Sequence, residues 1–216
     1  FAMQTGMAVI NFILNYQLVK YGAMTVIGAE NALASIGVVQ RVAQFSVFPI
    51  IGVATAIQPL LGYNYGARLV PRVRSTYKCG VIGATAICVL VWSIIYLFTT
   101  AIVSAFGIVN DDLNEFTAFA MRVQFITLPI IGFQIVSSNY FQATGQPAKS
   151  IFLSLTRQIL FLIPLILFLP DLIPHIAPSL HGLDALYFAQ PCADLLSTVT
   201  TVVFVIWEVR RLRRME

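Results

Sequence analysis

The sequence predicts an all-α integral membrane protein, built as a bundle of six transmembrane helices. Of its 216 residues, 58% are hydrophobic and only 10% are charged, and the mean hydropathy is +0.85. Because a soluble domain carries about 25% charged residues, this chain has too few of them to cover a water-facing surface. A lipid bilayer is therefore its expected surrounding.

Six apolar segments support this fold class, since about 20 helical residues span the hydrocarbon core of a bilayer. We expect them within one membrane domain, residues 1–216, at about 1–20, 32–61, 77–106, 116–143, 149–170 and 185–207. Arg157 interrupts the fifth segment. Prolines recur within the spans and are expected to kink them: Pro49, Pro59, Pro129, Pro164 and Pro191. The chain starts inside an apolar segment without an initiator Met, so we expect half of a larger protein.

The charges predict the orientation of the six segments. If the first segment runs outward, ten of the thirteen basic residues lie on the inner side: Arg68, Arg72, Arg74, Lys78, Lys149, Arg157, Arg210, Arg211, Arg213 and Arg214. The outer loops then hold mainly acids: Glu30, Asp111, Asp112, Glu115, Asp171 and Asp184. This asymmetry predicts a multi-pass protein of the cell membrane with both ends cytoplasmic. It also explains the basic composition without a nucleic-acid partner.

The cysteines and histidines do not form a catalytic or metal-binding pattern. Cys79, Cys88 and Cys192 lie in or beside apolar segments and are interpreted as core residues. His175 and His181 share a loop without a cysteine or acidic cluster at ligand spacing, so solvated histidines are the expectation. No nucleophile, base or metal set converges. We therefore expect no enzyme, no metal and no cofactor.

Polar side chains recur at helical spacing within the apolar segments. The candidate cavity residues come from four segments: Asn11, Asn15, Gln44, Gln134, Ser138, Asn139 and Gln190. For any single amide or hydroxyl, a hydrogen bond that joins two helices is the better explanation. For four aligned stripes, a shared polar cavity is an equal alternative.

Asp194 is the most informative single residue. It lies about ten residues into the sixth segment, which puts it roughly 15 Å deep at 1.5 Å per residue. A carboxylate there costs about 2.5–3.5 kcal/mol and requires a partner, a proton or water. Arg41 has a similar depth on the second segment, so we predict an Asp194–Arg41 pair. That pair either fixes helix packing or contains a carboxylate that couples to a proton or another cation.

Two separate motifs resemble the MATE (multidrug and toxic compound extrusion) family. The run Gln58-Pro-Leu-Leu-Gly-Tyr-Asn-Tyr-Gly-Ala67, followed by Arg72 and Arg74, is similar to the family's hallmark after its eighth helix. The run Tyr140-Phe-Gln-Ala-Thr-Gly-Gln-Pro147 resembles the turn after its tenth helix. The resemblance covers essentially the whole chain.

The resemblance implies the carboxy-terminal lobe, helices seven to twelve, of a two-lobe, twelve-helix transporter. Such an antiporter exports small organic cations or drugs in exchange for H⁺ or Na⁺, and its partner here is the missing amino-terminal lobe. Some family members carry acidic cation ligands on the seventh and tenth helices. This chain has only amides there, which leaves Asp194 as the local candidate for a coupling carboxylate.

Two alternatives stay open. A flippase for a lipid-linked precursor, from the same superfamily, would favour a more basic cavity. A structural half-bundle without transport activity is the other. In that case replacing Asp194 with asparagine changes stability and leaves the response to ion gradients unchanged.

Overall fold

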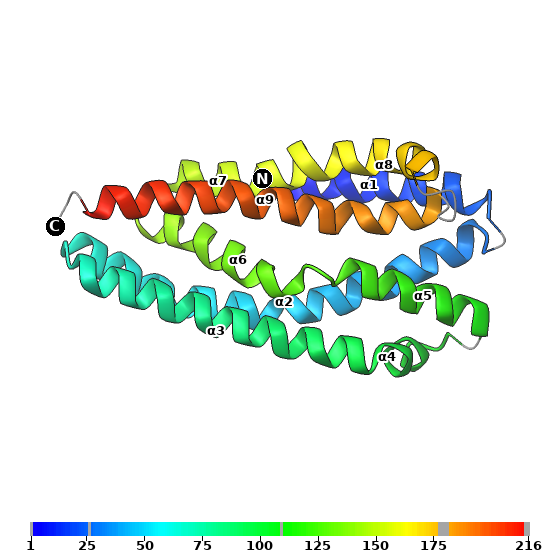
Figure 1. The fold of residues 1–216 in the computed structure, drawn as a ribbon, viewed down its shortest axis with the longest axis horizontal. Helices are drawn as coiled ribbons and strands as arrows, with labels where there is room; N and C mark the ends of the chain where they lie inside the picture. Colours follow the sequence, from blue (N-terminus) through cyan, green and yellow to red (C-terminus); the bar gives the residue numbers. More distant parts are fainter. Residues whose placement is uncertain (1, 26, 109, 177–181, 214–216) are drawn as a thin grey trace.

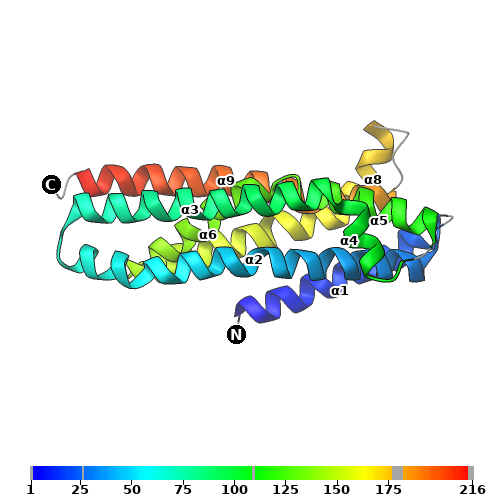
Figure 2. The ribbon, with the colours of Figure 1, turned by 90° about the horizontal axis from the view of Figure 1, so that it is seen from below.

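The computed structural model describes residues 2–25, 27–108, 110–176 and 182–213. Most of these residues form helical rods that lie roughly along one long axis (Figure 1). The short helix Thr99–Ala105 and the end of the helix that finishes at Ile176 turn away from that axis (Figure 2). The rods are α1 (Ala2–Gly22), α2 (Ala29–Gly66), α3 (Val70–Leu97) continued by α4 (Thr99–Ala105), α5 (Asp111–Gln124) with α6 (Leu128–Ala143), α7 (Pro147–Leu155) continued by η1 (Thr156–Leu162) and α8 (Ile163–Ile176), and α9 (Gly182–Arg213). The predicted all-α six-helix class is confirmed.

Four helical segments of the described chain are long and apolar enough to cross a membrane: Ala29–Gly66, Val70–Leu97, Pro147–Ile173 and Gly182–Leu212. α5 and α6 form a fifth span if they are taken together, with a bend of 46° between them. α1 has 21 residues but does not reach the same hydropathy. Amides such as Asn11, Asn15 and Gln17 interrupt its apolar residues.

The path of the chain gathers like charges at each end of the bundle. The α2–α3 turn, the α6–α7 turn and the end of α9 lie toward one end, on the left in Figure 1. This end holds most of the basic residues: Arg68, Arg72, Arg74, Lys78, Lys149, Arg210 and Arg211. The opposite end holds Glu30, Asp111, Asp112, Glu115, Asp171 and Asp184. Arg157 departs from the predicted pattern, because it lies within η1 and away from the basic turns.

Close packing joins α3 to α2 and α6, the rods it lies beside in Figures 1 and 2. A glycine sets the distance between α3 and α6. A Cβ atom added to Gly132 would lie 2.9 Å from Cys88 Sγ and 3.0 Å from the carbonyl carbon of Ala84. The missing side chain of Gly132 therefore allows the two backbones to approach.

Two irregular stretches interrupt the rods and position the site. The first is the break at 125–127 between α5 and α6, just before Pro129. The second is the π-helical stretch η1, just before Pro164. Proline has no backbone N–H, so the α-helical hydrogen bond to the residue four positions earlier is missing at each point. Pro49, Pro59 and Pro191 lie within the continuous helices α2 and α9.

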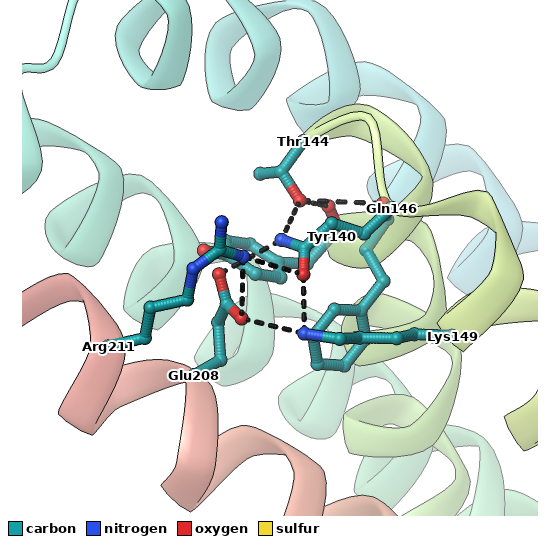
Figure 3. Close-up of polar contacts among 7 residues, drawn as sticks. Tyr140, Thr144, Gln146, Lys149, Glu208 and Arg211 are labelled. Carbon is teal, nitrogen blue, oxygen red and sulfur yellow. Dashed lines mark hydrogen bonds and ion pairs between the residues drawn. The ribbon is translucent and has the colours of Figure 1, made fainter.

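A buried polar cluster ties the end of α9 to the α6–α7 turn (Figure 3). Glu208 on α9 is 2% exposed. Its Oε1 accepts from Gln146 Nε2 at 2.9 Å, and its Oε2 accepts from Lys149 Nζ at 3.1 Å. Arg211 Nη1 lies 3.7 Å from the same Oε2. Gly145 turns the chain at φ +72°, which brings Gln146 against α9.

Candidate functional site

A fully buried carboxylate, Asp194 on α9, lies at the centre of the site. Its exposed fraction is 0%. Arg157 Nε donates to Asp194 Oδ1 at 2.7 Å, and Gln190 Nε2 donates to the same oxygen at 3.2 Å. Thr127 Oγ1 donates to Oδ2 at 3.1 Å. The charge is therefore paired and both oxygens accept hydrogen bonds, which is what a buried carboxylate requires.

Each partner of Asp194 is positioned by a different piece of local structure. Gln190 lies one helical turn earlier on α9, so the spacing i, i+4 brings the two side chains together. Thr127 comes from the break between α5 and α6. Arg157 comes from η1, where the π-helical turn changes the rotation of the side chains about the rod. Breaks and π-turns of this kind are frequent at functional sites.

Gln134 fixes the backbone beside the carboxylate. Its Nε2 donates to the main-chain oxygen of Asp194 at 2.7 Å and contacts Thr198 Oγ1. Thr198 Oγ1 donates to that same main-chain oxygen, also at 2.7 Å. Gln134 Oε1 is buried and has no hydrogen-bond donor among the described residues. Gln134 therefore joins α6 to α9 but leaves one acceptor unused.

A cavity of about 260 Å³ opens beside the carboxylate, and we call it the Asp194 cavity. Its polar lining is made of Asn11, Gln40, Gln124, Arg157, Gln190 and Asp194. Asn11 Oδ1 accepts from Gln40 Nε2 at 3.5 Å, which joins α1 to α2 across one wall. Apolar and aromatic side chains, among them Phe125, Leu128 and Tyr187, form the rest. An apolar pocket with a few convergent polar groups is typical of sites that bind small organic molecules.

A second cavity, of about 360 Å³, lies on the other side of Arg157, and we call it the hydroxyl cavity. Its polar lining is Gln134, Ser138, Asn139, Gln142, Ser150, Ser154, Arg157, Gln158, Ser197 and Thr201. Ser138 Oγ lies 2.9 Å from Ser150 Oγ. Arg157 lines both cavities. Among the described residues, Arg157 and Asp194 are the only charged side chains in either lining, and their formal charges cancel.

The predicted Asp194–Arg41 pair is wrong. Arg41 is exposed on α2, and the partner of Asp194 is Arg157. The prediction matched Arg41 and Asp194 by depth along the bundle axis. Depth does not specify the direction in which a side chain leaves its helix, and that direction separates the two residues here.

The other predicted site residues divide into three groups. Gln134 and Gln190 contact Asp194 directly. Asn11 lines the Asp194 cavity, and Ser138 and Asn139 line the hydroxyl cavity. Asn15 and Gln44 are exposed and line neither cavity. The side chain of His175 and all of His181 lie outside the described residues.

Sequence reasoning missed three residues of these polar clusters. Arg157 was counted with the basic turns, although a charge inside an apolar segment is itself a signal that a partner exists. Thr127 has no such signal, because its role depends on the break in the helix. Glu208 was not recognised either, because its place near basic residues at the chain end is typical of a solvated side chain.

The sequence of this chain is similar to those of one family of known proteins. A sequence model of the MatE family matches residues 5–168. The multidrug export protein MepA of Staphylococcus aureus is 25% identical over 205 residues, which are 95% of this chain and 42% of that protein. MepA of Staphylococcus haemolyticus is 25% identical over 146 residues, covering 68% of this chain and 30% of that protein. The chain thus spans less than half the length of these relatives.

Solved structures share the fold. An inward-facing multidrug resistance MATE family transporter of the MOP superfamily superposes with a TM-score of 0.85 at 20% identity, over 98% of this chain and 46% of that chain. An outward-facing structure of such a transporter superposes with a TM-score of 0.84 at 20% identity, over 99% of this chain and 45% of that chain. A MOP superfamily transporter from Pyrococcus furiosus superposes with a TM-score of 0.81 at 22% identity, over 99% of this chain and 44% of that chain.

Proposed function

Since the chain belongs to the MatE family of multidrug and toxic compound extrusion (MATE) transporters, we propose that it forms the carboxy-terminal lobe, helices seven to twelve, of a two-lobe antiporter. The whole protein exports organic cations or drugs in exchange for H⁺ or Na⁺, and an amino-terminal lobe completes the transport path. One observation carries this proposal. Asp194, a fully buried carboxylate, lines a cavity whose other walls are mainly apolar.

The chemistry of the Asp194 cavity suits an organic cation. The carboxylate attracts positive charge, and aromatic walls such as Phe125 and Tyr187 suit a flat apolar body. The same carboxylate is able to take a proton or Na⁺. Because two cations then compete for one carboxylate, binding of either favours release of the other, as antiport requires. Asn11 and Gln190 are the amides that we assign to substrate contacts in this cavity.

The orientation follows from the charges. We assign the basic end of the bundle to the cytoplasm, so that both ends of the described chain face that side of the cell membrane. Glu208 is buried within its polar cluster at this end, so it does not oppose the assignment as an exposed acid would.

The test is gradient-driven transport by the full-length protein in proteoliposomes. Ethidium is the probe, and a proton gradient and a Na⁺ gradient are imposed separately. We expect at least one of the two ion gradients to drive ethidium movement in the direction opposite to the flow of the ion. Asp194→Asn is expected to abolish that movement. Glu115→Gln, an exposed acid at the other end of the bundle, is the matched control and is expected to behave as wild type.

Other outcomes decide between the alternatives. No ethidium movement under either gradient would contradict the antiporter. Flipping of a fluorescent lipid-linked sugar by the same vesicles would instead support the flippase. Unchanged transport by a folded Asp194→Asn protein would leave the buried pair with a structural role alone.

A further inference from the structure

Arg157 lies between the two cavities and contributes to the lining of each. Its side chain is 27% exposed, whereas that of Asp194 is 0% exposed. Arginine has a long side chain with several rotatable bonds, whereas the aspartate side chain is short and reaches much less far. Of the two members of this ion pair, Arg157 is therefore the one that is able to move.

The hydroxyl cavity offers acceptors for the same guanidinium group. Gln134 Oε1 and Gln158 Oε1 are both buried, and neither has a hydrogen-bond donor among the described residues. Both residues line the hydroxyl cavity together with Arg157. Buried amide oxygens without donors are rare, because each loses its hydrogen bonds to water without replacement. A guanidinium group carries five N–H donors, which is enough to satisfy both oxygens.

We propose that Arg157 is an internal cation that competes with transported cations for Asp194. When a proton or an organic cation neutralises Asp194, the Arg157 guanidinium moves to Gln134 Oε1 and Gln158 Oε1 in the hydroxyl cavity. When that cation leaves, Arg157 returns to Asp194. A cation or a bound proton thus neutralises Asp194 in each state, so the negative charge of this buried carboxylate is never left without compensation.

This arrangement makes Arg157 a determinant of specificity. A ligand has to displace a guanidinium that is already held beside the carboxylate, so a neutral or anionic molecule gains nothing from Asp194. Monovalent cations whose charge reaches Oδ1 or Oδ2 are the ligands that the exchange selects. The meaning of the exchange for transport rests on the proposed function, whereas the movement of Arg157 can be tested without transport.

The direct test is the structure of the full-length Asp194→Asn protein. Asparagine has the shape of aspartate without its charge, so it imitates the neutralised state. We expect the Arg157 guanidinium within hydrogen-bond distance of Gln134 Oε1 or Gln158 Oε1. A guanidinium that still contacts residue 194 would overturn the proposal, whatever the transport assay shows.

A second test measures thermal stability and needs no structure. Gln158→Leu removes one unused acceptor, so in the wild-type background we expect an unchanged or higher unfolding temperature. In the Asp194→Asn background the same change should lower it, because Arg157 then depends on Gln158. Gln142→Leu, which alters an exposed residue of the same cavity, should have equal effects in both backgrounds. Equal effects for Gln158→Leu would contradict the movement.

Cation binding provides a third test that does not require the Asp194→Asn protein to fold. Arg157→Gln removes the internal competitor, so tetraphenylphosphonium should bind about tenfold more tightly than to wild type. Arg122→Gln, a change of an exposed arginine on α5, should leave the affinity unchanged. An affinity that is unchanged or weaker in folded Arg157→Gln protein would oppose the proposal. A failure of gradient-driven efflux alone would count against the antiporter and not against this exchange.

Discussion

Lys149 and Glu208 form an ion pair that joins the α6–α7 turn to the last turns of α9, with 3.1 Å between Nζ and Oε2. Lys149 Nζ also lies 4.0 Å from the centre of the Trp207 ring, so the lysine is held by a charge and by an aromatic face. Gln146 donates to the other oxygen of Glu208. The buried carboxylate therefore organises one end of the bundle.

Removing this carboxylate should destabilise the protein. Glu208→Ala removes the carboxylate that accepts from Lys149 and Gln146. Loss of one partner of a buried pair costs about 3–5 kcal/mol, but Lys149 keeps its bond to Gln146 Oε1 and Gln146 keeps its bond to Thr144 Oγ1. Lys149 and Arg211 are partly exposed, so we expect a smaller loss, about 2 kcal/mol. Thermal unfolding in lipid nanodiscs measures it. The exposed acid Glu115 is the control, and an equal loss for Glu115→Ala would contradict the role of Glu208.

The two arginines considered as partners of Asp194 should differ sharply. Arg157→Gln removes the partner of a fully buried carboxylate, which corresponds to a loss of about 3–5 kcal/mol in unfolding free energy. Arg41→Gln alters an exposed side chain, so we expect a change within about 0.5 kcal/mol. Chemical denaturation of both variants in the same detergent checks this. Comparable losses would mean that Arg41 does contribute to the site.

The hydroxyl group of Thr127 should contribute measurably to the site. Thr127→Val keeps the shape of the side chain but removes the donor to Asp194 Oδ2, and hydrogen bonds to charged groups contribute about 1.5–3 kcal/mol. We expect a loss in this range, measured by thermal unfolding. Thr55→Val, on the exposed face of α2, removes only hydrogen bonds to the main chain of its own helix. A loss no larger than that of the control would exclude the assigned role.

A methyl group added between α3 and α6, where their backbones lie close together, should destabilise the protein. Gly132→Ala places a Cβ 3.0 Å from the Ala84 backbone, and overpacking of this kind costs about 1–3 kcal/mol. Gly52→Ala adds a methyl group that meets nothing within 4 Å beyond the backbone of its own helix, so α2 should be as stable or more stable. Unfolding temperatures of the two variants give the comparison. Tolerance of Gly132→Ala would show that α3 is able to shift.

Much of the fold was predictable because a bilayer requires apolar helical segments of a minimum length, and composition and segment length are read directly from the sequence. The apolar run around Ile50 has to form a helix in a bilayer, because its backbone polar groups find no water there. The basic residues of the turns indicate that these turns lie at the same end of the bundle. The prolines were informative in part. Pro129 and Pro164 mark the breaks that position Thr127 and Arg157, whereas Pro191 lies in a continuous helix. A proline removes one hydrogen bond, and neighbouring structure decides whether the helix breaks.

The sequence by itself determined the class of the protein, the family to which it is similar and the need of Asp194 for a partner. Hydropathy, charge asymmetry and short motifs are properties of the chain that hold before it folds. Only the tertiary structure decided that the partner is Arg157, that Asn15 and Gln44 lie outside both cavities, and that Glu208 is buried. Partner choice depends on how each helix is rotated about its axis, and that rotation is set by packing against other rods and by the π-helical turn in η1.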